Sequence, residues 1–132
     1  MKLVGIDIAK YEHAAFIMEA STGESLCDPF FFKNNKEGFK KLYTELNKYS
    51  KNELLIGMED TGHYNFAIES SLLAEGYKVA LINPITTKSL RKASLKSVKS
   101  DKEDALLITK ALLDKAYYRI ISIPVSYTHL TL

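Results

Sequence analysis

The sequence predicts one α/β domain built on a mixed β-sheet, and three observations support that class. Three short segments of strand pattern come first and are joined by tight reversals. Helical and strand periodicity then alternate along the rest of the chain. With 132 residues, of which 46% are hydrophobic, the chain is long enough for one domain with a real core and too short for two ordinary ones.

The first three strands are expected to form an antiparallel meander. The first is the apolar run at residues 3–8, the second covers residues 14–18, and the third leads through residues 25–26 to residues 30–32. Residues 21–24, with the sequence Ser-Thr-Gly-Glu, have the composition of a turn. Short reversals of this kind place the second strand directly beside the first.

The remaining pattern predicts helix, strand, helix, strand, helix. The first helix, which either Asn34 or Asn35 can cap, has apolar and aromatic residues at helical spacing: Phe39, Leu42, Tyr43, Leu46 and Tyr49. A strand at 54–58, a helix at 64–75, a strand at 78–82 and a helix at 102–117 follow. Because crossovers between parallel strands are right-handed, we expect a five-stranded sheet of order 3-2-1-4-5 with helices on both faces.

Four acidic residues are the candidate functional groups. Asp7 and Glu59 end the first and fourth strands, and Asp101 and Asp104 lie three residues apart at the start of the last helix. Ligands of open α/β sheets bind where the carboxyl ends of strands meet. Carboxylates are hard oxygen ligands that suit Mg²⁺ or Mn²⁺, and a pair of such ions promotes phosphoryl transfer. Alternatively, Asp7 caps a turn, and the Asp101–Asp104 pair complements the helix dipole.

A basic stretch precedes the last helix. The formal net charge is only +2, but five cationic residues follow Ile85 with no acid before Asp101: Lys88, Arg91, Lys92, Lys96 and Lys99. Lysine and arginine neutralise backbone phosphates without reading sequence, so this stretch predicts contact with nucleic acid. A solvated loop or helix face explains the same composition.

The other reactive side chains indicate structural roles. The single cysteine, Cys27, cannot form an internal disulfide and fits a reducing compartment. His13 and His63 follow strands, where a turn or hydrogen-bonding role is expected. Since no apolar run approaches the length of a membrane span, we expect a soluble, cytoplasmic protein with no membrane partner.

Residues 4–10, 57–64, 82–84 and 99–105 resemble the successive motifs of the DEDD insertion-sequence transposases. This family comprises bridge-RNA-guided recombinases and includes pilin-gene invertases. The resemblance implies that residues 1–117 form a RuvC-like N-terminal domain of the ribonuclease H-like fold. It also implies a transposase or recombinase activity, with DNA and a structured guide RNA as partners and a homo-oligomer in the full-length protein. The acidic metal ligands and catalytic residues would be Asp7, Glu59, Asp101 and Asp104.

Residues 118–132 are expected to be an atypical tail, as in a chain truncated before the family's second domain, which carries a catalytic serine. The end of this tail, residues 124–132, is not expected to resemble the family. Ser126 lies in this tail and is not expected to be the nucleophile, so complete recombination by this chain alone is not expected.

Two other functions fit parts of the pattern. The first is half of an actin-like sugar kinase or ATPase, whose first strand also ends in Gly-x-Asp. Against it, the turn at residues 8–11 lacks the glycines that let a backbone approach phosphates. The second is a non-catalytic nucleic-acid-binding domain of the same fold.

Overall fold

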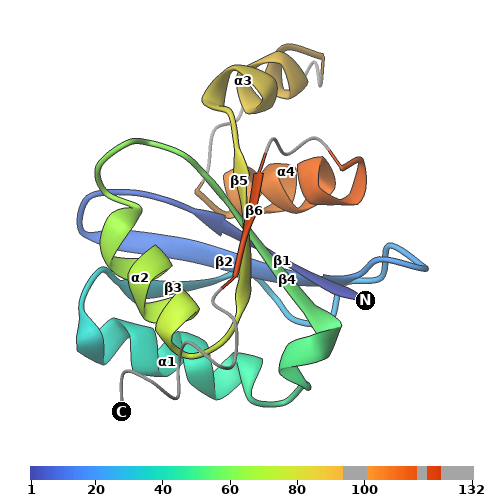
Figure 1. Cartoon of the computed structure of the whole chain (residues 1–132). Helices are drawn as coiled ribbons and strands as arrows, with labels where there is room; N and C mark the ends of the chain where they lie inside the picture. Colours follow the sequence, from blue (N-terminus) through green and yellow to red (C-terminus); the bar gives the residue numbers. More distant parts are fainter. Residues whose placement is uncertain (94–100, 116–118, 123–132) are drawn as a thin grey trace.

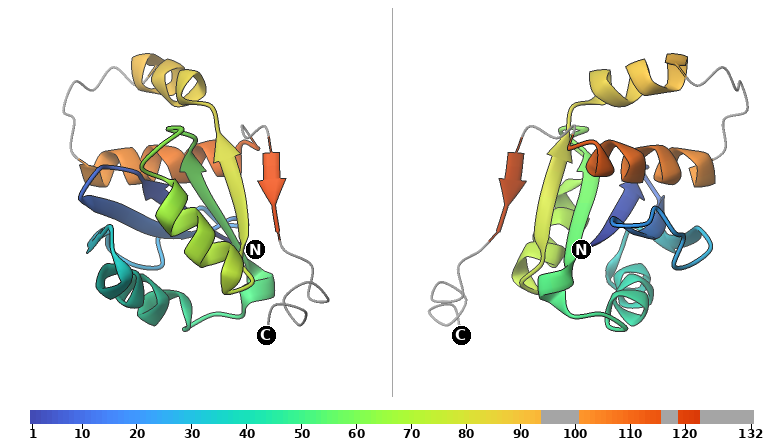
Figure 2. Two further views of the ribbon diagram at one scale, coloured as in Figure 1. Left: turned by 60° about the vertical axis from the view of Figure 1, so that its left-hand side comes forward. Right: turned by 90° about the vertical axis from the view of Figure 1, so that its right-hand side faces the viewer.

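The computed structural model describes residues 1–93, 101–115 and 119–122. Within these residues the strands and helices lie in three layers, with a sheet between two helical faces (Figures 1 and 2). In chain order the elements are β1 (Lys2–Asp7), β2 (Glu12–Glu19), β3 (Phe30–Lys33), α1 (Lys36–Leu46), the 3-10 helix η1 (Lys51–Glu53), β4 (Leu54–Glu59), α2 (Phe66–Ala74), β5 (Lys78–Ile82), α3 (Pro84–Ala93), α4 (Asp101–Leu113) and β6 (Arg119–Ile121).

The strand order in the sheet is β3-β2-β1-β4-β5-β6. β1 pairs antiparallel with β2 and parallel with β4, and β4 pairs parallel with β5. The predicted order 3-2-1-4-5 is therefore confirmed. β6 was not predicted: it lies within residues 118–132 and adds a sixth strand antiparallel to β5.

β1 is central because both of its faces are apolar and both are covered. Val4 and Ile6 are fully buried in the core under α1 and α2, together with Ile56 and Met58 of β4. Leu3 points to the opposite face and packs in the core under α4. An interior strand covered on both sides shows this nearly continuous apolar run rather than an alternating pattern.

α1 covers one face of the sheet and begins at Lys36. Its N-cap is Asn35, whose Oδ1 accepts a hydrogen bond from the backbone N–H of Gly38 at 2.8 Å, so the second of the two candidate asparagines caps the helix. Phe39, Leu42 and Leu46 are buried in the core on this side, in agreement with the predicted helical spacing.

α4 covers the other face and lies very close to the sheet. A Cβ atom at Gly5 would be 2.6 Å from the carbonyl oxygen of Ala105, and one at Gly57 would be 2.4 Å from Cδ2 of Leu112. Only glycine allows a helix to approach two neighbouring strands this closely. α4 therefore crosses the sheet with Ala105 over β1 and Leu112 over β4.

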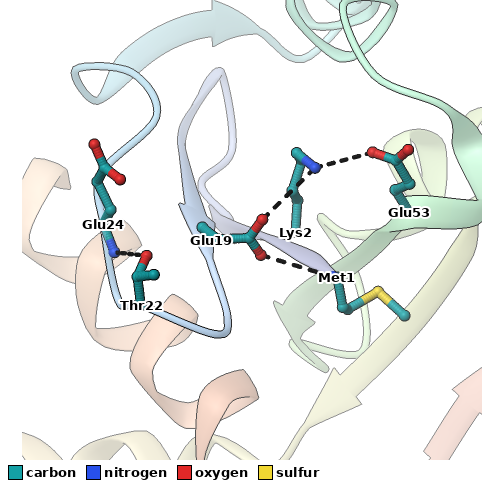
Figure 3. Close-up of polar contacts among 6 residues, drawn as sticks. All are labelled: Met1, Lys2, Glu19, Thr22, Glu24 and Glu53. Carbon is teal, nitrogen blue, oxygen red and sulfur yellow. Dashed lines mark hydrogen bonds and ion pairs between the residues drawn. The ribbon is translucent and has the colours of Figure 1, made fainter.

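An ion-pair cluster lies at the amino end of β1, at the edge opposite the carboxyl ends of the parallel strands. Lys2 Nζ lies 2.9 Å from a carboxylate oxygen of Glu53 and 3.7 Å from one of Glu19. The amino terminus lies 3.7 Å from the other oxygen of Glu19. Figure 3 shows Lys2 between these two glutamates, of which Glu19 ends β2 and Glu53 directly precedes β4.

Two helices are shorter than their patterns predict. Residues 64–75 and 102–117 were expected to be helical, whereas α2 spans Phe66–Ala74 and α4 spans Asp101–Leu113. Lys115 has a positive φ of 56°, a conformation that does not continue a right-handed helix. In the described ranges, no helix combines the length and the hydropathy needed to cross a bilayer.

Candidate functional site

Asp7 and Glu59 occupy equivalent positions at the ends of two neighbouring parallel strands. Gly5 is opposite Gly57 and Ile6 is opposite Met58, so the next residue of each strand is one of the two acids. Side chains alternate along a strand, and Gly5 and Gly57 face α4. Asp7 and Glu59 therefore lie on the α4 face, both half-buried. The register confirms the prediction that these two strands end at the same edge of the sheet.

The other two acids belong to α4, which packs on the same face. Asp104 is half-buried and directly precedes Ala105, whose carbonyl lies over Gly5. Asp101 is the first residue of α4, and its side chain lies outside the described residues. β1, β4 and α4 thus bring the backbones of the four predicted acids to one face of the sheet.

The described carboxylates are not gathered into a metal-binding cluster. They include those of Asp7, Glu59 and Asp104, and among the described residues no group of three or more His, Cys, Asp or Glu could hold a metal ion. The donor chemistry itself, oxygen only, suits a hard divalent cation.

Glu59 is held by a residue that sequence reasoning missed. Thr87 is fully buried, and its Oγ1 donates to Oε1 of Glu59 at 2.6 Å. Thr87 lies in the first turn of α3, a helix that was not predicted. The signal for it is Asn83 followed by Pro84, since asparagine is a good N-cap and proline is favoured at the first helical position. Oδ1 of Asn83 indeed accepts from the N–H of Ile85 at 2.9 Å.

The loop after Glu59 is fixed by its own hydrogen bonds. The N–H of Asp60 donates to the carbonyl of Ile82 at 3.0 Å. Thr61 Oγ1 donates to Oδ1 of the fully buried Asn65 at 2.8 Å, and Nδ2 of Asn65 donates to Glu69 at 3.1 Å. His63 is exposed in this loop, with its ring against that of Tyr64. These bonds set the direction of the chain where it leaves the carboxylate.

His13 fixes the loop after Asp7. Its side chain is fully buried, and Nδ1 accepts from the N–H of Ala9 at 3.1 Å, so the proton of the neutral ring is on Nε2. Burial lowers the pKa of His13 below its usual value, an effect larger than the opposing one of Asn34. Asn34 Nδ2 also donates to the carbonyl of Lys10 at 3.1 Å. As predicted, His13 is a hydrogen-bonding residue next to a turn.

The basic stretch begins on α3, directly after Thr87. Lys88 is exposed on this helix. Arg91 and Lys92 belong to α3, but their side chains lie outside the described residues, as do Lys96 and Lys99 altogether.

The single cysteine, Cys27, is half-buried, and burial raises the pKa of its thiol. A neutral thiol of this kind agrees with the expected structural role.

The fold defines the class of protein first. The chain superposes on Thermus thermophilus RuvC, solved in complex with a Holliday junction substrate, with a TM-score of 0.61 and 13% sequence identity. The match covers 92% of this chain and 99% of that one. Together with the strand order, it establishes a ribonuclease H-like α/β fold.

The sequence then identifies the family. The model of the IS110-type DEDD transposases, described as transposase, matches residues 4–131, so the chain belongs to this family. It is also 28% identical over 109 residues to the pilin gene-inverting proteins of Moraxella bovis and Moraxella lacunata. That match covers 81% of this chain and 33% of each relative, so the chain spans about a third of their length.

Proposed function

We propose that this chain is the ribonuclease H-like domain of a DNA transposase or recombinase and acts on phosphodiester bonds with the help of divalent metal ions. The observation that carries the proposal is the alignment of Asp7 and Glu59 on adjacent parallel strands under α4, in a chain that belongs to a transposase family. The proposal concerns this domain's share of the reaction, because the curated relatives are about three times longer.

The residues that would hold Mg²⁺ or Mn²⁺ are the four acids, Asp7, Glu59, Asp101 and Asp104. They come from two strand ends and one helix, and these elements are packed against one another. Bound ions would activate an attacking oxygen and stabilise a leaving one.

The rest of the chain would orient the substrate. Lys88 is exposed on α3, next in the chain to Thr87, which contacts Glu59. The remaining cationic residues follow it in the sequence: Arg91, Lys92, Lys96 and Lys99. Ammonium and guanidinium groups there would bind the DNA backbone and hold a phosphodiester at the carboxylate edge.

The partners of the proposed domain would be DNA, a structured guide RNA and further copies of the same chain. DNA is supported by the likeness to RuvC, which was solved with a Holliday junction substrate, and by the gene-inverting relatives. Guide RNA and oligomerisation rest on the motif resemblance of residues 4–10, 57–64, 82–84 and 99–105.

Nicking of supercoiled plasmid in Mn²⁺ tests the proposal. The 132-residue chain is expected to produce nicked circles that EDTA abolishes. Asp7→Asn should remove the nicking, because it takes away a carboxylate while keeping the side-chain shape. Asp60→Asn is the matched control, since it removes the same charge from the residue after Glu59. Nicking that survives Asp7→Asn, or none from the parent chain, would reject the assigned activity.

A further inference from the structure

Thr87 makes a contact that packing alone does not require. It and Thr109 are both fully buried threonines on helices, and both hydroxyls approach a carbonyl one turn back, that of Pro84 at 3.0 Å and that of Ala105 at 2.7 Å. Such a contact within a helix is ordinary for threonine. Thr87 differs because its hydroxyl also reaches a carboxylate on another element, Oε1 of Glu59.

The distances show which acceptor takes the proton. A hydroxyl has one proton, and both the Pro84 carbonyl and the Glu59 carboxylate can only accept it when Glu59 is ionised. The Thr87–Glu59 distance of 2.6 Å is within the range of charge-assisted O–H···O⁻ bonds, whereas the contact to Pro84 is 3.0 Å. The shorter distance favours Glu59 as the acceptor of the proton.

Hydrogen bonds connect the helix that carries Thr87 to the end of β4. α3 starts directly after β5, and Asn83 caps it by accepting from the N–H of Ile85. The N–H of Asp60, the residue after β4, donates to the carbonyl of Ile82 at the end of β5. The two ends of the Thr87–Glu59 bond thus belong to segments that these hydrogen bonds join. A glutamate side chain has three rotatable bonds and loses much freedom when one oxygen is held, so the bond selects an orientation in advance of any ligand.

We propose that Thr87 is a positioning residue that orients the Glu59 carboxylate for the divalent metal site. The inference rests on the proposed function. Hydrogen-bond partners of metal-binding carboxylates typically change metal affinity about 10- to 100-fold when they are removed. Thr87 is predicted to act in this way, through Glu59 and without touching metal or DNA.

Two substitutions separate the hydroxyl from the shape of the side chain. Thr87→Val keeps the shape and removes the hydroxyl, whereas Thr87→Ser keeps the hydroxyl and removes a methyl group. Mn²⁺ affinity measured by calorimetry should fall about ten-fold or more in Thr87→Val and stay near the parent value in Thr87→Ser. Without metal, the ¹³Cδ resonance of Glu59, assigned with Glu59→Gln, should move in Thr87→Val and not in Thr87→Ser.

The outcomes separate this role from the proposed function. If the parent chain binds Mn²⁺ and Thr87→Val binds it equally well, Thr87 has no positioning role although the metal site stands. If Thr87→Ser is the weaker binder, the residue acts by packing and the inference is wrong. A parent chain that binds no Mn²⁺ would reject the metal site and this role together.

Discussion

Replacing Gly5 with alanine should push α4 away from β1. The added Cβ would lie 2.1 Å from Oγ1 of Thr109, 2.6 Å from the carbonyl oxygen of Ala105 and 2.7 Å from the backbone nitrogen of Thr109. Two of these three atoms belong to the helix backbone and cannot rotate away. Ordinary contact begins near 3.4 Å, so α4 has to retreat by about 0.8 Å at Ala105.

The expected loss of stability is about 2 kcal/mol. Overpacking of a tight interior costs about 1–3 kcal/mol, and the backbone clash places Gly5→Ala at the upper end. Alanine returns about 0.4–1 kcal/mol by restricting the unfolded chain, since Gly5 is not among the residues with positive φ. For a domain of this size the net cost corresponds to a melting temperature about 8 °C lower.

Gly57→Ala provides a matched comparison. The three atoms nearest to its Cβ would all be side-chain atoms of Leu112, at 2.4–2.6 Å. Leu112→Ala alone should cost about 2–5 kcal/mol by leaving a cavity, but in that background Gly57→Ala should be nearly harmless. Thr109→Ala should rescue Gly5→Ala only partly, because the backbone atoms remain.

Urea unfolding of the single and double variants measures these differences directly. Mn²⁺ affinity should fall in Gly5→Ala as well, since α4 carries Asp101 and Asp104. A Gly5→Ala protein that melts within about 1 °C of the parent, well short of the shift worked out above, would show that α4 does not lie directly on β1.

Three further results are expected. Because burial lowers the pKa of His13 in the folded protein, the unfolded chain binds a proton at this residue more readily than the folded one. The stability that the neutral ring contributes is therefore complete above the ordinary pKa of 6.5 and decreases below it. His13→Asn keeps an acceptor for the N–H of Ala9 and should flatten this pH dependence in urea titrations at pH 7.5 and 5.5. Lys2→Ala should change the melting temperature little, because solvent and salt screen its ion pairs, and a large decrease would contradict that view. Lys88→Gln should lower the slope of log affinity against log salt for DNA by about one unit, whereas an unchanged slope would leave Lys88 as a solvated residue.

The order of the sheet could be predicted from short sequence patterns and one general rule of handedness. Turn residues fixed the meander, and the right-handed crossover then placed β4 beside β1, so the alignment of Asp7 with Glu59 followed from handedness and strand length. Two glycines on the α4 face suggest close approach by some element, but nothing in their neighbourhood says that Ala105 and Leu112 supply it.

The missed features depend on contacts between distant positions. α3 has few apolar residues, and its Asn83–Pro84 start also suits the end of a strand. Thr87 and Glu59 are 28 positions apart, so their hydrogen bond appears only once β4, β5 and α3 are assembled. β6 has three residues, too few for a periodic signal, and it exists through pairing with β5.

Calorimetric titration of Mn²⁺ into the metal-free chain tests the central claim most directly. The parent chain and the control Asp60→Asn should bind, whereas Asp7→Asn and Glu59→Gln should show no binding while their circular dichroism and melting remain those of a folded protein. Binding in Asp7→Asn or Glu59→Gln equal to that of the parent, or no binding by the parent at all, would contradict a metal site at the carboxyl ends of β1 and β4.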